Sequence, residues 1–168
     1  MGIGLAALCA PAFMPMSAHQ RVFLVYNPTD SVPGGWYRVG SIDNAASLHV
    51  GSIVLARLPA HVALFAGQRG YLPSDVPILK RVGAVAPQSV CVRGQIVRID
   101  DAVVATARTE DGARRRLQAW PQCRTLAAGE LFLLSDTNSA SFDSRYFGPI
   151  AASAVLGLAR PLSLWSTP

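Results

Sequence analysis

The chain has 168 residues and a net charge of +5, with 51% hydrophobic but only 15% charged residues. A chain of this length forms one domain that buries about two-thirds of its unfolded surface. The apolar composition favours contact with a membrane or a large apolar groove. The basic residues are densest at Arg114–Arg116, beside Glu110 and Asp111, as in a solvated hairpin tip. Because neither a recognition motif nor stacking aromatics accompany them, a nucleic-acid partner is excluded.

The first segment of the chain is apolar. Residues 2–18 carry no charged side chain, but they are fewer than the roughly 20 apolar residues that span a bilayer and lack a positively charged start. We expect residues 1–20 to form a hydrophobic export signal and membrane anchor, followed by one domain over residues 21–168. A buried first strand or helix is the alternative. Leu8 is too bulky for a lipoprotein cleavage site before Cys9, so a lipid anchor is not expected.

Short strands separated by turn residues follow this segment. Runs rich in β-branched and aromatic residues predict strands at 21–26, 36–39, 53–58, 76–85, 89–93, 95–99, 102–107 and 130–134. Pro59 can open a short helix over residues 61–68, which Gly70 ends. The segment 150–160 is compatible with either a helix or a strand. Together these elements predict a mainly β, antiparallel domain with one or two short helices.

The cysteines offer one disulfide within the domain. Cys9 lies in the expected anchor, which leaves Cys91 and Cys123. An exported protein in an oxidising compartment would pair them, whereas two buried free thiols are the alternative. A zinc site is not expected, because no Cys-x-x-Cys pair exists and the histidines are scattered. These histidines are His19, His49 and His61. We therefore expect neither a metal nor another cofactor.

Three segments carry a recognisable pattern. They read Asn-Pro-Thr-Asp-Ser-Val-Pro at 27–33, Ile-Leu-Lys-Arg-Val at 78–82 and Ser-Phe-Asp-Ser-Arg-Tyr-Phe-Gly at 141–148. In that order they resemble the serine, lysine and aspartate/arginine boxes of the signal peptidase superfamily. The resemblance is closest to its conjugative-transfer branch, the TraF-like pilin-processing peptidases, and it runs from about residue 22 to residue 150. It implies a signal-peptidase-like antiparallel β catalytic domain over residues 21–168.

The resemblance implies roles for the first segment. Ser31 matches the nucleophilic serine, which in this superfamily lies in a Ser/Thr-x-Ser segment followed by a proline, here Thr29 to Pro33. The Ser31 backbone N–H and the Thr29 hydroxyl match the two donors to the oxyanion. One such donor contributes about 3–4 kcal/mol in the transition state.

Lys80 matches the general base of the second segment. A lysine can accept the serine proton only when it is neutral, so its pKa must fall from about 10.4. In a strand, Lys80 shares one face with the apolar residues Ile78 and Val82. Burial between them would lower its pKa to about 7–8 by removing water from the charged form.

The third segment matches residues that support the base. By resemblance, Ser141 hydrogen-bonds the lysine, and Asp143 and Arg145 form an ion pair behind the site. We expect that pair to share one face of a strand at i, i+2, with Asp143 supporting catalysis but not acting as the base. Two departures from the general signal peptidases favour the conjugation branch: Pro87-Gln88-Ser89 replaces Pro-Gly-Asp, and 135–140 lacks a Gly-Asp-Asn lead-in.

The leading hypothesis is a membrane-associated serine endopeptidase with a Ser/Lys dyad. It would act at the periplasmic face of the bacterial inner membrane on an exported precursor such as a conjugative pilin. Its partners would be that precursor and the conjugation or secretion apparatus. The acyl-enzyme would be resolved by water or, with cyclisation, by the amino terminus of the pilin. A general type I leader peptidase is one alternative, and a non-catalytic assembly protein of the apparatus is the other.

Overall fold

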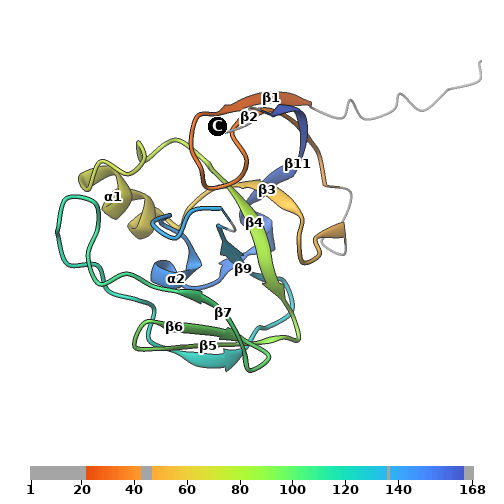
Figure 1. The fold of residues 1–168 in the computed structure, drawn as a ribbon. Coiled ribbons are helices and arrows are strands. Elements are labelled where there is room, and N and C mark those ends of the chain that lie inside the picture. The colour runs from red at the N-terminus through yellow and green to blue at the C-terminus, as the bar shows by residue number, and fades with distance from the viewer. Residues whose placement is uncertain (1–21, 43–46, 136, 165–168) are drawn as a thin grey trace, which may run out of the picture.

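A computed structural model describes residues 22–42, 47–135 and 137–164 and shows two antiparallel sheets (Figure 1). The larger sheet has the order β1 (Phe23–Asn27), β2 (Gly35–Gly40), β11 (Val155–Leu164), β3 (Ile53–Ala56), β4 (Ile78–Val85), β9 (Glu130–Leu134) and β10 (Ile150–Ala151). The smaller sheet has the order β7 (Ala102–Thr106), β6 (Ile96–Ile99), β5 (Ser89–Arg93) and β8 (Cys123–Thr125). The prediction of a mainly β, antiparallel domain is thereby confirmed.

Two α-helices accompany the sheets. Pro59 precedes α1 (Ala60–Gln68) with φ at −52°, which suits a helix start, and α1 buries Val62 and Ala66. The second helix, α2 (Ser144–Phe147), replaces the strand predicted around Asp143 and Arg145, and that prediction is wrong. Asp143 is the N-cap of α2, because its side chain accepts a hydrogen bond from the Arg145 backbone N–H. Gly148 ends the helix at φ +76°, a conformation that favours glycine.

The segment after α2 forms strands. The structure divides it into β10, a 3-10 turn at Ala152–Ala154 and β11, which pairs with both β2 and β3. Of the two alternatives for residues 150–160, the strand is therefore the main outcome. Because β11 lies between β2 and β3, it joins the first hairpin of the chain to β3 and β4, and β4 carries the segment 78–82.

Apolar side chains from both sheets form the core. One cluster lies around Ile78, Val82 and Leu133 on the larger sheet, and a second joins Phe132 and Leu134 to the smaller sheet. A third cluster contains Val32 and Leu79. Strand β4 contributes to the first and third clusters, so residues on both of its faces are buried. Because both faces of β4 are covered, its polar residue Lys80 is also buried.

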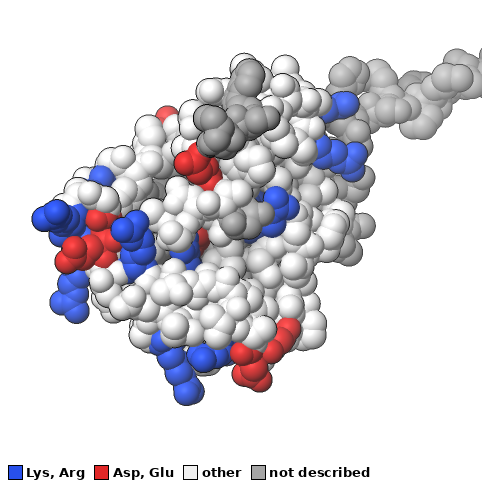
Figure 2. Space-filling view, viewed as in Figure 1, with Lys and Arg blue, Asp and Glu red and all other residues white. Residues whose placement is uncertain are grey.

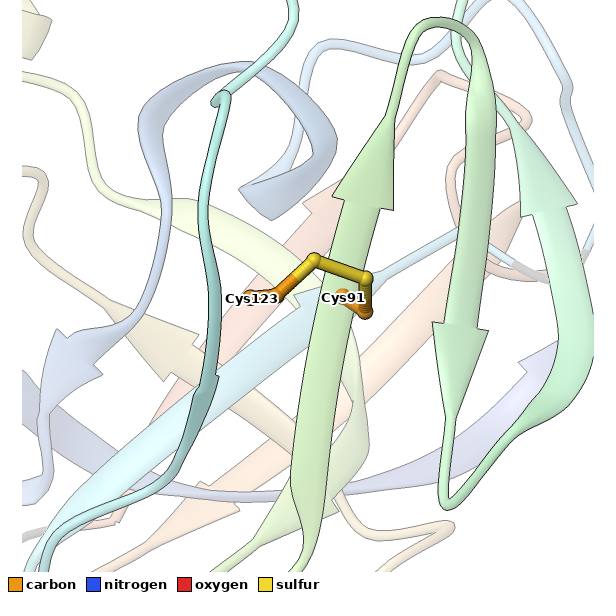
Figure 3. The surroundings of a disulfide bond; sticks show 2 residues. All are labelled: Cys91 and Cys123. Atoms are coloured by element: carbon orange, nitrogen blue, oxygen red, sulfur yellow. A yellow bond between two sulfur atoms is a disulfide. The ribbon is translucent and has the colours of Figure 1, made fainter.

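The two domain cysteines lie opposite each other in the smaller sheet. Cys91 of β5 pairs in register with Cys123 of β8, and their sulfur atoms are joined in a disulfide (Figure 3). Both residues belong to the four-stranded sheet, whereas Ser31 and Lys80 lie on or beside the seven-stranded sheet. The disulfide therefore fastens β8 to β5 and is not part of the candidate site.

Charged residues of both signs gather at one end of the molecule. In Figure 2 blue and red atoms mix at the left, where Figure 1 places α1 and the loop after β7. This loop contains Glu110, Asp111 and Arg114–Arg116. The backbones of Glu110 and Arg116 pair in an isolated antiparallel β-bridge that closes its tip. Most of the central surface in the same view is uncharged.

Within the described part of the chain, no helix has the length and apolar character needed to cross a membrane. Residues 1–20, the expected anchor, lie outside that part.

Candidate active site

Ser31 lies in the turn between β1 and β2, with only 9% of the residue exposed. Its Oγ donates a hydrogen bond to the backbone carbonyl of Leu79, at 3.2 Å. This contact bridges 48 positions of sequence and ends on the residue immediately before Lys80. Thr29 Oγ1 lies 3.0 Å from Ser31 Oγ on the same turn, and Thr29 is exposed. The structure thus brings the segment 27–33 against the segment 78–82.

Asn27, at the end of β1, holds this turn from the inside. Its Nδ2 donates to the backbone carbonyls of Thr29, Val32 and Pro33, at 2.9, 3.0 and 3.3 Å. Its Oδ1 accepts hydrogen bonds from the backbone N–H and the hydroxyl of Thr29. In the sequence, Asn27 stands out only as the first residue of the segment 27–33, directly after the strand predicted at 21–26. Asparagine's tendency to hydrogen-bond nearby backbone groups is the signal that could have identified this role.

Lys80 is buried in β4, with 5% of the residue exposed. Burial lowers the pKa of Lys80 to about 8, because the charged form loses its water; negative Asp143 opposes this shift, and positive Arg145 adds to it. The Lys80 Nζ donates a hydrogen bond to Ser141 Oγ, which links the second segment to the third. Lys80 is also the only lysine in the chain, whose other basic residues, the three histidines aside, are arginines.

Asp143 and Arg145 form a fully buried ion pair behind Lys80. Arg145 Nε lies 2.8 Å from Asp143 Oδ1, and a second guanidinium nitrogen donates to Oδ2 at 2.9 Å. The expected ion pair is therefore present, although it spans a helix N-cap instead of a strand face. A buried ion pair in this two-point geometry is well matched.

The guanidinium of Arg145 also fixes the loop that carries Ser141. It donates to the backbone carbonyls of Ser139 and Ser141, at 2.8 and 2.9 Å, and to that of Thr106 in β7. Phe142, the next residue, packs between aromatic rings of α1 and α2, including Phe65 and Tyr146. Ser141 is thus held by the hydrogen bonds of the Arg145 guanidinium and by the aromatic packing of its neighbour Phe142. These contacts direct its hydroxyl to Lys80.

The predicted site residues meet in one place, although they come from three distant segments. Ser31 reaches the backbone of Leu79, Lys80 reaches Ser141, and Asp143 and Arg145 hold the loop behind it. No hydrogen bond between Ser31 and Lys80 is present among the described residues. The arrangement provides a half-exposed turn with a hydroxyl, a buried amine whose pKa is lowered to about 8 and an uncharged partner for that amine. Such a set suits nucleophilic catalysis with general-base assistance.

Comparisons with known proteins identify a family and several relatives of this chain. Residues 2–165 match the family model described as "Signal peptidase, peptidase S26". The chain is 34% identical over 167 residues to a probable conjugal transfer protein TraF of Sinorhizobium fredii, covering 94% of this chain and 86% of the relative. It is 34% identical over 170 residues to the conjugal transfer protein TraF of Agrobacterium fabrum, covering 96% and 92%. A plasmid transfer protein TraF of Escherichia coli is 30% identical over 150 residues, covering 83% and 82%.

A solved structure is also similar. The signal peptidase I of Enterococcus faecalis is 19% identical and aligns with a TM-score of 0.41, covering 70% of this chain and 98% of that protein.

Proposed function

The chain belongs to the signal peptidase family of serine peptidases and is related to the TraF conjugal transfer proteins, and on that basis we propose that it is a membrane-associated endopeptidase with a Ser31/Lys80 dyad. The observation that carries this proposal is the environment of Lys80. Lys80 is buried, has a pKa near 8 and is held by the neutral hydroxyl of Ser141. It also directly follows Leu79, whose carbonyl binds Ser31 Oγ, so it is prepared to act as a base.

The proposed reaction proceeds through an acyl-enzyme. Neutral Lys80 Nζ takes the proton of Ser31 Oγ while this oxygen attacks the scissile carbonyl carbon. The peptide C–N bond then breaks, and protonated Lys80 returns its proton to the leaving amine. An ester between Ser31 and the acyl part of the substrate remains. Attack on that ester by water completes hydrolysis, whereas attack by the substrate's own amino terminus yields a cyclic product.

The oxyanion of the tetrahedral intermediate needs donors. We assign this role to the Ser31 backbone N–H and the Thr29 hydroxyl, because Thr29 is an exposed residue whose Oγ1 lies 3.0 Å from the nucleophilic oxygen. Asp143 and Arg145 do not touch the reacting atoms in this scheme, and Ser141 touches only Lys80 Nζ, the proton acceptor. They hold Lys80, and the uncharged Ser141 partner leaves the pKa of the amine low, unlike a directly bonded carboxylate.

The outer face of the first hairpin supports membrane association. Opposed residues of β1, β2 and β11 place Leu24, Tyr26, Trp36, Arg38 and Arg160 on one face of the sheet. The rings of Tyr26 and Trp36 are in contact, and Leu24 is 66% exposed. Exposed aliphatic and aromatic residues beside arginines suit the boundary between lipid and water, where these side chains are favoured. Strand β1, which supplies Leu24 and Tyr26 to this face, also comes soon after the expected anchor in the sequence.

The proposed substrate is an exported precursor of the conjugation apparatus, such as a pilin. The relatives' names, conjugal and plasmid transfer proteins, support this class of substrate. The proposed location is the periplasmic face of the bacterial inner membrane, and the disulfide supports it because disulfides persist in oxidising compartments.

Co-expression with the pilin precursor tests the proposal. Mass spectrometry should show a cleaved pilin with the wild-type chain, and a further loss of one water if the product is cyclic. Ser31→Ala should abolish processing, and Lys80→Arg should nearly abolish it, because a guanidinium stays protonated and cannot accept the hydroxyl proton. Ser74→Ala, at an exposed position of another loop, is the matched control that should process normally. Substantial processing by Lys80→Arg would contradict the dyad.

A further inference from the structure

Asn27 is buried beside the proposed nucleophile, with 5% of the residue exposed, and uses both ends of its amide on one loop. Its nitrogen faces three carbonyl oxygens, and its oxygen faces an N–H and a hydroxyl. The reverse orientation of the amide would oppose donors to donors and acceptors to acceptors. The network therefore fixes which atom is Nδ2 and which is Oδ1.

This assignment determines the direction of the hydrogen bond at Thr29. The Thr29 hydroxyl has one proton, and its oxygen lies 2.7 Å from Asn27 Oδ1, which can only accept. The proton of Thr29 therefore points to Asn27 in the resting protein. Thr29 Oγ1 is left as an acceptor toward Ser31 Oγ, 3.0 Å away. The Ser31 proton then has two resting acceptors, Thr29 Oγ1 and the Leu79 carbonyl.

We propose that Asn27 is a positioning residue that orients the Thr29 hydroxyl and fixes the turn carrying Ser31. The inference rests on the proposed function. When the oxyanion forms, the Thr29 proton turns from Asn27 Oδ1 to the new negative oxygen, while the other Asn27 contacts keep Thr29 in place. The hydrogen bond from Thr29 to a neutral amide is easier to break than one to a carboxylate, since hydrogen bonds to charged acceptors are stronger. The amide also supplies the donors for Thr29, Val32 and Pro33 that a carboxylate lacks.

Two substitutions separate these roles. Asn27→Ala removes every contact, and Asn27→Asp keeps a similar shape but replaces the donor by a charge. We expect both to lower kcat by about 10- to 100-fold while KM changes by less than about threefold, because the oxyanion contacts form in the transition state. Asn27→Asp should be no more active than Asn27→Ala. Recovery of activity by Asn27→Asp would overturn the proposal, because it would show that the shape of the side chain is sufficient.

A double-mutant cycle with Thr29→Val tests whether Asn27 acts through Thr29. Thr29→Val alone should lower kcat by about 100- to 1000-fold. In the Asn27→Ala background the same substitution should cost less than about a tenth of that factor, because the hydroxyl is no longer oriented. Additive losses would mean that Asn27 only stabilises the fold, and they would overturn the inference.

Tyr37→Phe provides the matched control. The Tyr37 hydroxyl donates to the Pro33 carbonyl at 2.6 Å, so this change removes a hydrogen bond from the same loop but leaves the Asn27–Thr29 contacts. It should lower the unfolding temperature while kcat stays within about twofold, since the neutral hydrogen bond to Pro33 is lost. Thermal unfolding of all variants identifies any that fail to fold. Processing by Ser31→Ala would overturn the proposed function itself, whereas an inactive Ser31→Ala with an additive cycle would overturn only the role of Asn27.

Discussion

At the scale of single residues, Lys80 determines the pH dependence of the proposed reaction. The pKa of Lys80 is lowered to about 8, and the base must be neutral to accept the Ser31 proton. The kcat/KM should therefore rise with pH and level off above about pH 8. Because Lys80 is the only lysine, labelling lysine with an NMR-active isotope gives one side-chain signal, whose titration reports this pKa directly. A signal that titrates near about pH 10.4 would contradict the proposed base.

The same pKa shift has a consequence for stability. Below about pH 8 Lys80 is protonated in both states, and burying its charge opposes folding; between about pH 8 and 10.5 only the unfolded chain keeps this proton, so stability rises with pH. A shift of this size corresponds to roughly 3 kcal/mol. Lys80→Met should therefore be inactive but raise the free energy of unfolding at pH 7 by about 1–3 kcal/mol, and the gain should shrink toward pH 10. Denaturant unfolding at both pH values measures it, and a pH-independent difference would contradict the argument.

At the scale of elements, local patterns predicted most strands but not the contacts that assemble the site. The runs Ser89–Arg93 and Glu130–Leu134 begin and end where their β-branched and aromatic residues place them. Strand β8 has only three residues, too few for a pattern to be recognised. The spacing of Asp143 and Arg145 fits a strand face as well as a helix N-cap, and the capping of α2 decides between them. The contact of Ser31 with the Leu79 carbonyl depends on tertiary packing, and no local spacing contains it.

The loop between β7 and β8 is held by one carboxylate. Asp111 accepts hydrogen bonds from the Tyr71 hydroxyl, at 2.6 Å, and from Arg69 and Arg115. Burial opposes the ionisation of Asp111, but these bonds and two backbone N–H donors outweigh it and hold its pKa well below the usual range. The stabilisation is therefore present above about pH 4 and is lost as pH falls through the lowered pKa.

Asp111→Asn should release this loop from α1 without unfolding the sheets. Trypsin should then cut more rapidly at Arg114–Arg116, because proteases require an extended and accessible backbone. Limited proteolysis followed by mass spectrometry measures the rate. Glu110→Gln changes a neighbouring exposed carboxylate and is the matched control. Equal cleavage of the two variants would show that Asp111 does not hold the loop.

At the scale of the whole molecule, the disulfide connects stability to compartment. The bridge closes a loop with a sequence separation of 32, and Cys91→Ala with Cys123→Ala should lower the free energy of unfolding by about 3–4 kcal/mol in the chain-entropy model. Protein isolated from the periplasm should resist alkylation at both positions until it is reduced. If both thiols react without reduction, the alternative of two free cysteines holds and the disulfide no longer supports an oxidising location.

Membrane association should have two separable sources, the expected anchor at residues 1–20 and the outer face of β1, β2 and β11. A chain that starts at Arg21 should keep its fold and become more soluble, yet still float with vesicles that contain anionic lipid, because Leu24, Tyr26 and Trp36 remain exposed beside Arg38 and Arg160. Leu24→Ser in this shorter chain should reduce flotation. Leu64→Ser is the matched control, since Leu64 is similarly exposed at 58% but lies on α1.

The two leucines distinguish a membrane-binding face from general apolar exposure. If the face binds lipid, only Leu24→Ser weakens flotation, and the turn that carries Ser31, which joins β1 to β2, is held close to the bilayer where an exported precursor emerges. Equal losses from both substitutions would mean that the molecule adsorbs through any exposed apolar side chain. If the shorter chain partitions as the full chain does, residues 1–20 are not an anchor and belong instead to the folded core.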